Sequence, residues 1–196
     1  FWGDLVLASV DIFWSFRSPY SYLAMRRLRD MSKTWDIPFN MRPVYPIAVR
    51  IPGFFKQVNP MWPPYLIRDT VRIAEQLNIP YSWPNPDPVV MDISTGEVPE
   101  DQPYIHRLTR LGQLATQSGD TLAFFDEISR TIWSDSSDWT EGDRLQQAAE
   151  RAGYNLDEMD KRQDAEKDQL EEDIRKNEAD QKAAGHWGVP LMVFEG

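Results

Sequence analysis

The sequence predicts an α/β fold in which a strand, a helix and a second strand come first, a long helical stretch follows, and a short strand comes last. Apolar residues alternate with period two over residues 9–17 and 37–44, which is typical of half-buried strands. Between them, residues 19–33 carry apolar side chains at helical spacing. Because the links are short, we expect a β-α-β unit whose two strands pair in parallel.

The first strand ends and the first helix begins within the stretch Ser15–Leu23. Ser18 is a favoured N-cap residue, and Pro19 suits the first helical position because an N–H there would have no partner. This arrangement places a hydroxyl at the positive end of a helix, beside the end of a core strand. Such a place suits an anion, including a thiolate, although a simple N-cap remains the alternative.

Residues 43–64 are predicted to form an irregular connection, because they are too rich in proline for the interior of a helix or sheet. The aromatic residues of this connection indicate either the wall of a ligand site or a loop packed on the core by its own side chains. Downstream, residues 80–88 are predicted to be extended. The further predicted helices cover residues 64–77, 103–118, 121–134 and 143–152.

Residues 155–184 are the most polar part of the chain and are predicted to be helical, with a charged face exposed to solvent. The last predicted strand covers residues 191–194. We therefore expect a discontinuous first domain (1–46 plus 186–196) and an all-helical insertion domain (47–185) over one side of the sheet.

Composition narrows the possible functions of this 196-residue chain. The net charge of -10 argues against nucleic acid or an anionic membrane as a partner. The sequence has 0 cysteines, so any thiol chemistry must use the thiol of a ligand. Two isolated histidines do not indicate a metal site. The apolar opening Phe1–Ala8 has no basic flank and is not expected to be a signal peptide, which favours a cytoplasmic location.

Two stretches resemble the signature of DsbA-like thioredoxin-fold proteins. They are Ser18-Pro19-Tyr20-Ser21-Tyr22-Leu23 and Trp187-Gly188-Val189-Pro190-Leu191. More narrowly, the chain resembles the 2-hydroxychromene-2-carboxylate isomerases and the kappa-class glutathione transferases. Redox members of the fold carry Cys-x-x-Cys in the first stretch, whereas Ser18 and Ser21 stand at those places here, as in the two glutathione-using groups.

The resemblance implies that glutathione is the cofactor. Ser18 would be the catalytic residue, hydrogen-bonding the glutathione sulfur, and the backbone of Val189 would pair with the cysteinyl part of glutathione. Pro190 would be cis, and Asn59 matches a family asparagine near glutathione. Family members also continue into a further strand, a Gly-x-Asp-Arg-like turn and a closing helix. We therefore expect the C-terminal strand and helix of this fold to be missing from the sequence as given.

The implied function is a glutathione-dependent isomerase of a small aromatic 2-hydroxychromene-2-carboxylate-like substrate, in aromatic catabolism. A glutathione transferase that conjugates electrophiles and a non-catalytic thioredoxin-fold binding module are the alternatives. A homodimer is expected from the family. The candidates for substrate binding are Tyr20, Trp62 and Tyr65 as an aromatic pocket, with Asp69 or Arg72 as the polar orienting group. Packing in the core is the alternative role of the three aromatic side chains.

Overall fold

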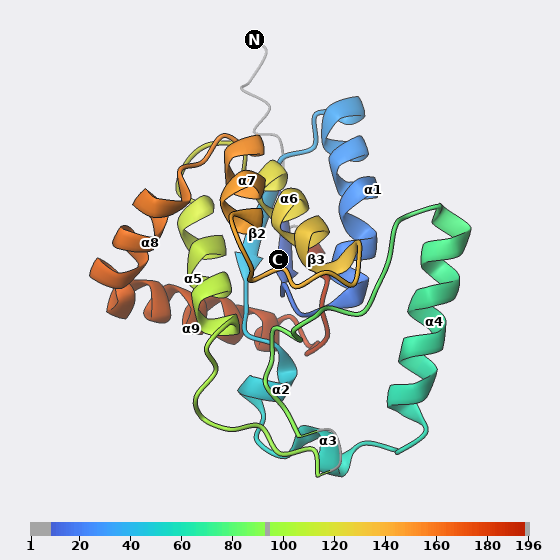
Figure 1. Ribbon diagram of the computed structural model, residues 1–196. Helices are drawn as coiled ribbons and strands as arrows, with labels where there is room; N and C mark the ends of the chain where they lie inside the picture. The colour runs from blue at the N-terminus through green and yellow to red at the C-terminus, as the bar shows by residue number, and fades with distance from the viewer. Residues whose placement is uncertain (1–8, 93–94, 195–196) are drawn as a thin grey trace.

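The computed structural model describes residues 9–92 and 95–194, and its centre is a mixed sheet with strand order β2-β1-β3 (Figure 1). The central strand β1 (Val10–Trp14) pairs in parallel with β2 (Phe39–Pro43). On its other side β1 pairs antiparallel with β3 (Leu191–Phe194). The predicted β-α-β unit and the last strand are thus confirmed. The opening residues that the sequence analysis considered lie outside the described ranges.

Most of the chain between β2 and β3 is helical (Figure 1). In the described ranges, no helix combines the length and the apolar composition needed to cross a membrane. The helices are α1 (Pro19–Trp35), α2 (Ile47–Arg50), α3 (Phe54–Gln57), α4 (Trp62–Leu77), α5 (Ile105–Ala115), α6 (Thr121–Trp133), α7 (Arg144–Arg151), α8 (Leu156–Ala165) and α9 (Lys167–Ala183).

The proline-rich connection is more regular than predicted, because it contains the single-turn helices α2 and α3. Some of its prolines lie at helix starts, where a helix can accept them. Pro46 is the N-cap residue of α2, and Pro63 lies in the first turn of α4. At these positions the missing N–H of proline costs no intrahelical hydrogen bond. Proline disrupts the interior of a helix but not its first turn, so a proline-rich segment can still contain short helices.

Aromatic side chains join the end of β1 to helix α6. The ring of Phe16 stacks on Phe125 with a centroid distance of 5.1 Å. The indole N–H of Trp133, which is fully buried, donates to the backbone carbonyl of Phe16 at 2.8 Å. The phenol ring of Tyr22 on α1 stacks on the same tryptophan at 6.4 Å. These contacts fix the turn between β1 and α1, where Ser18 lies, against the core.

The charged face of α9 is exposed to solvent, as predicted, but its buried side carries two polar side chains that the sequence did not indicate. Asn177 is buried, and its side-chain amide donates to the carbonyl of Pro43 at 2.9 Å and to Gln113 at 3.0 Å. Gln181 is fully buried one turn later. Each amide thus donates to a backbone carbonyl at the end of β2 or just before β3, which offsets the cost of burying these polar side chains.

Replacing Gly112 with alanine should lower the free energy of unfolding by about 1–3 kcal/mol, as overpacking of a core does. The added Cβ would lie 2.8 Å from Cε2 of Phe16 and 3.3 Å from Cζ of Phe125. Both rings are buried and stacked on each other, so neither can retreat freely. Urea unfolding measures the change. A gain of about 1 kcal/mol, as helix propensity alone would give, would contradict this account of the packing.

Candidate functional site

Ser18 is the N-cap of α1, as the sequence predicts. Its backbone is extended, with φ -91° and ψ 117°, and its hydroxyl oxygen accepts the backbone N–H of Ser21 at 3.2 Å. Pro19 occupies the first turn. The backbone N–H of Ser18 donates to the carbonyl of Ser15 at 3.1 Å, which closes the turn that leaves β1. The hydroxyl therefore lies at the positive end of a 17-residue helix.

The second signature stretch meets this turn across the sheet. The Ser18 hydroxyl donates to the backbone carbonyl of Val189 at 3.1 Å. The peptide bond between Val189 and Pro190 is cis. Within residues 9–92 and 95–194, the backbone N–H of Val189 donates to no acceptor. Val189 thus offers one unused donor and one carbonyl whose only side-chain donor in those ranges is Ser18.

The hydroxyl of Ser18 has only one proton to donate, and in this structure that proton goes to Val189. An anion bound beside the start of α1 can take the proton only if the carbonyl of Val189 is released. The released carbonyl then needs another donor, because a polar group left unpaired out of water is costly. The site is therefore suited to a ligand that brings both an anion and an N–H group.

Tyr20 and Asp69 form a hydrogen-bonded pair between α1 and α4. The phenol of Tyr20 donates to Oδ2 of Asp69 at 2.7 Å. Burial, and then the neighbouring carboxylate, raises the pKa of Tyr20 well above its usual range, so the phenol stays neutral. Tyr65 and Arg72, also on α4, are exposed. The structure brings Tyr20 and Asp69 together and leaves the side chains of Tyr65 and Arg72 exposed to solvent.

Trp62 belongs to an aromatic cluster that reaches the second signature stretch. Its ring lies 6.3 Å from that of Trp187, and both rings pack edge-on against Phe54, at 6.0 and 5.3 Å. Trp187 remains 48% exposed, so the cluster presents an open aromatic surface two residues before Val189. Asn59 is exposed and its side chain accepts the backbone N–H of Met61 at 2.9 Å, ahead of α4.

Arg17, directly before Ser18, makes contacts that the sequence did not indicate. Its guanidinium donates to both carboxylate oxygens of Asp87, at 3.2 and 3.0 Å, and lies 5.2 Å from the ring centre of Trp83. The bidentate pair ties the turn after β1 to the extended segment at residues 80–88. The position of Arg17 beside Ser18 was a usable signal, but nothing in the sequence marked Asp87 as its partner.

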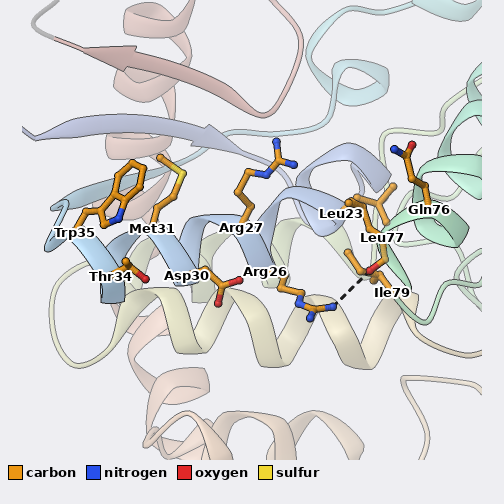
Figure 2. Close-up of a pocket in the computed structure, with 10 residues that line it drawn as sticks. All are labelled: Leu23, Arg26, Arg27, Asp30, Met31, Thr34, Trp35, Gln76, Leu77 and Ile79. Atoms are coloured by element: carbon orange, nitrogen blue, oxygen red, sulfur yellow. Dashed lines mark hydrogen bonds between the residues drawn. The ribbon is translucent and has the colours of Figure 1, made fainter.

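A cavity of about 470 Å³ lies along the outer side of α1, away from the candidate site (Figure 2). Leu23, Trp35 and Leu77 are among its lining residues, whereas Ser18 and Val189 are not. Figure 2 shows the side chain of Arg26 pointing to the carbonyl of Leu77. In the described ranges, no group of three His, Cys, Asp or Glu side chains is placed to hold a metal ion.

The sheet, the helix that starts at Ser18 and the cis-proline beside it define a thioredoxin-like protein. The sequence profile of the DSBA-like thioredoxin domain matches residues 9–196. The chain therefore belongs to the DsbA-like thioredoxin family, as its motifs indicate. A direct sequence comparison with curated proteins gives no match.

Solved structures of other proteins share the fold. A 2-hydroxychromene-2-carboxylate isomerase is 19% identical with a TM-score of 0.64, and the alignment covers 94% of this chain and 84% of that one. The cytosolic disulfide reductase DsbM from Pseudomonas aeruginosa is 15% identical with a TM-score of 0.59, covering 96% and 85%. The same reductase with GSH gives 14% and 0.59, covering 95% and 86%.

Replacing Asp69 with asparagine should lower the pKa of the Tyr20 phenol. The neutral amide removes the negative charge that opposes the phenolate, while burial, the larger cause, still keeps the pKa above that of an exposed tyrosine. NMR titration of the Tyr20 ring measures the change. Glu75→Gln, an exposed change on the same helix, is the matched control. An unchanged Tyr20 titration in the Asp69 variant would show that the hydrogen bond is not formed in solution.

Proposed function

We propose that the protein is a glutathione-dependent isomerase of a small aromatic 2-hydroxychromene-2-carboxylate-like substrate. The observation that carries the proposal is the hydrogen bond from the Ser18 hydroxyl to the carbonyl of Val189, at the start of α1 and beside the unused N–H of Val189. This arrangement fits a peptide that carries a thiol. Its thiolate would accept a hydrogen bond from the Ser18 hydroxyl, and its backbone would pair with that of Val189. The absence of cysteine fits a site that receives its thiol from a ligand.

Bound glutathione would supply a thiolate that adds reversibly to an electron-poor carbon of the substrate. The Ser18 hydroxyl would donate a hydrogen bond to the thiolate sulfur and keep its proton, and Val189 would pair with the peptide through its N–H and carbonyl. A hydroxyl donor to an anion contributes about 1.5–3 kcal/mol and a helix N-terminus about 0.3–2 kcal/mol. The lost hydrogen bond to Val189 offsets about 1 kcal/mol of this stabilisation. The remainder lowers the pKa of a bound thiol from about 8.5 toward about 7.

Ser18 is suited to stabilise a thiolate and not to act as a nucleophile itself. A serine nucleophile needs a general base within hydrogen-bond reach. In the described ranges, the partners of the Ser18 hydroxyl are the N–H of Ser21 and the carbonyl of Val189, and neither can take a proton from it. The role of a hydrogen-bond donor is therefore the one that its surroundings support.

The open aromatic surface around Trp62 and the exposed Tyr65 would contact the flat substrate. The guanidinium of Arg72 is the polar group suited to its carboxylate, and Tyr20, whose phenol proton goes to Asp69, would contribute its ring to the aromatic pocket. Asp69 would act through Tyr20, which it holds at 2.7 Å. The isomerase and the reductase solved with GSH, which share this fold, lend support to this choice.

Two measurements test the proposal. Calorimetry with reduced glutathione measures binding, and the absorbance of a 2-hydroxychromene-2-carboxylate, followed with and without glutathione, measures isomerisation. Binding together with glutathione-dependent turnover is the expected result. Binding with conjugation of a general electrophile in place of isomerisation would favour the transferase alternative. No binding of glutathione would overturn the proposal and favour a module that binds other ligands.

Replacing Ser18 with alanine should weaken the binding of reduced glutathione about tenfold or more, because a charge-assisted hydrogen bond is lost. Loss of the N-cap should also cost about 0.5–2 kcal/mol of stability. Comparison with S-methylglutathione separates the two effects, because this ligand forms no thiolate. Its affinity should change far less than that of glutathione. An equal loss of affinity for both ligands would show that Ser18 acts only as an N-cap and not as a thiolate donor.

The matched control for this prediction is Ser21→Ala. Ser21 is fully buried, and in the described part of the chain its hydroxyl has no hydrogen-bond partner. Removal of an unpaired buried hydroxyl should leave stability unchanged or slightly increased. Glutathione binding by this variant should match the wild type, which would show that the effect at Ser18 does not arise from any serine-to-alanine change in the motif.

A further inference from the structure

We propose that Arg50 and Gln181 are positioning residues that hold the backbone of Trp187–Val189 ready for the ligand. The inference rests on the proposed function for the identity of that ligand, glutathione. It adds two residues, from α2 and α9, that no motif of the sequence indicates. Neither is placed to touch the reacting atoms, so each would act through the position of Val189.

Three successive carbonyls of this segment each accept a hydrogen bond from a different side chain. Arg50 donates to the carbonyl of Trp187 at 2.9 Å, and Gln181 donates to that of Gly188 at 2.8 Å. Ser18 donates to that of Val189 at 3.1 Å. Arg50 also donates to the side-chain carbonyl of Gln181 at 2.7 Å, so the first two donors orient each other. The carbonyl of Val189, which would pair with the ligand, is therefore the last of three consecutive carbonyls, and Arg50 and Gln181 hold the two before it.

The N–H side of the same segment is also fixed. The backbone N–H of Gly188 donates to Nδ1 of His186 at 2.8 Å. A Cβ at Gly188 would lie 2.7 Å from Cε1 of His186, so a larger residue here would displace the imidazole from this hydrogen bond. With the N–H of Gly188 already used, the next N–H along the chain is that of Val189, which remains available. The segment thus presents one donor and one acceptor at the same residue.

Apart from the packing of Trp187 on Phe54 and Trp62, polar contacts keep the segment in place. Residues 182–187 are exposed, while Gln181 just before them is fully buried. Without its anchors, an exposed connection of this kind is mobile, and a ligand must then order it on binding. Loss of one neutral hydrogen bond is worth about a three- to tenfold change in affinity.

Gln181→Glu is the sharpest test. The carboxylate keeps the size of the side chain and an acceptor for Arg50, but it cannot donate to the carbonyl of Gly188. Gln169→Glu is the matched control, because Gln169 lies on the exposed first part of α9 and donates to Asp173 at 3.0 Å. A second test variant, Arg50→Lys, keeps the charge but cannot reproduce the fixed geometry of two guanidinium donors.

The readouts are the NMR order parameters of the amides of Trp187, Gly188 and Val189, the dissociation constant for glutathione, and the melting temperature. In Gln181→Glu and Arg50→Lys, the order parameters should fall toward the flexible range, below about 0.6, and the dissociation constant should rise about three- to tenfold. The melting temperature should fall by only a few degrees, because one hydrogen bond is lost while the fold is kept. If Gln181→Glu fails to fold, Arg50→Lys decides.

Order parameters that match those of Gln169→Glu would overturn the positioning role, whether or not glutathione binds. A fall in order parameters with unchanged glutathione affinity would also overturn it. If the wild type does not bind glutathione, the proposed function fails, and the order parameters still decide whether these two side chains hold the segment.

Discussion

The hydrogen bond from Ser18 to Val189 joins residues 171 positions apart, and the rest of the site is arranged around it. Its geometry follows from the sheet. Because β3 runs antiparallel to β1, the residues that lead into β3 lie beside the residues that leave β1. The chain also starts α1 at this corner, so a helix N-terminus, a hydroxyl and a free backbone N–H meet there.

The long helical stretch between β2 and β3 supports this corner from two sides. On one side the indole of Trp133 on α6 holds the carbonyl of Phe16, within the core. On the other side the amides of Asn177 and Gln181 on α9 hold carbonyls at the end of β2 and before β3. The helices thus bury apolar surface and also satisfy backbone groups that the three-stranded sheet of the described chain leaves open.

Local patterns predicted most of the fold, because strand and helix periods and the Ser18–Pro19 start signal are properties of neighbouring residues. They failed where a side chain is defined by a distant partner. An amide such as Gln181 in a charged run has the sequence pattern of a solvated residue, and only the packed structure reveals the carbonyl that it meets. For the same reason the sequence indicated Ser18 but not Arg17 or Arg50, whose partners lie far away.

Under the proposed function, the resting bond to Val189 also contributes to selectivity. A ligand can accept the hydrogen bond of the Ser18 hydroxyl only by competing with the neutral carbonyl of Val189, whose oxygen lies 3.1 Å from the Ser18 Oγ. Charge-assisted hydrogen bonds are about twice as strong as neutral ones, so an anionic sulfur competes well and a neutral thiol or thioether does not. The freed carbonyl of Val189 then favours a ligand whose backbone N–H lies beside it, as in a neighbouring strand. Selection of a thiolate that is part of a peptide follows from these two conditions together, without any cysteine in the protein.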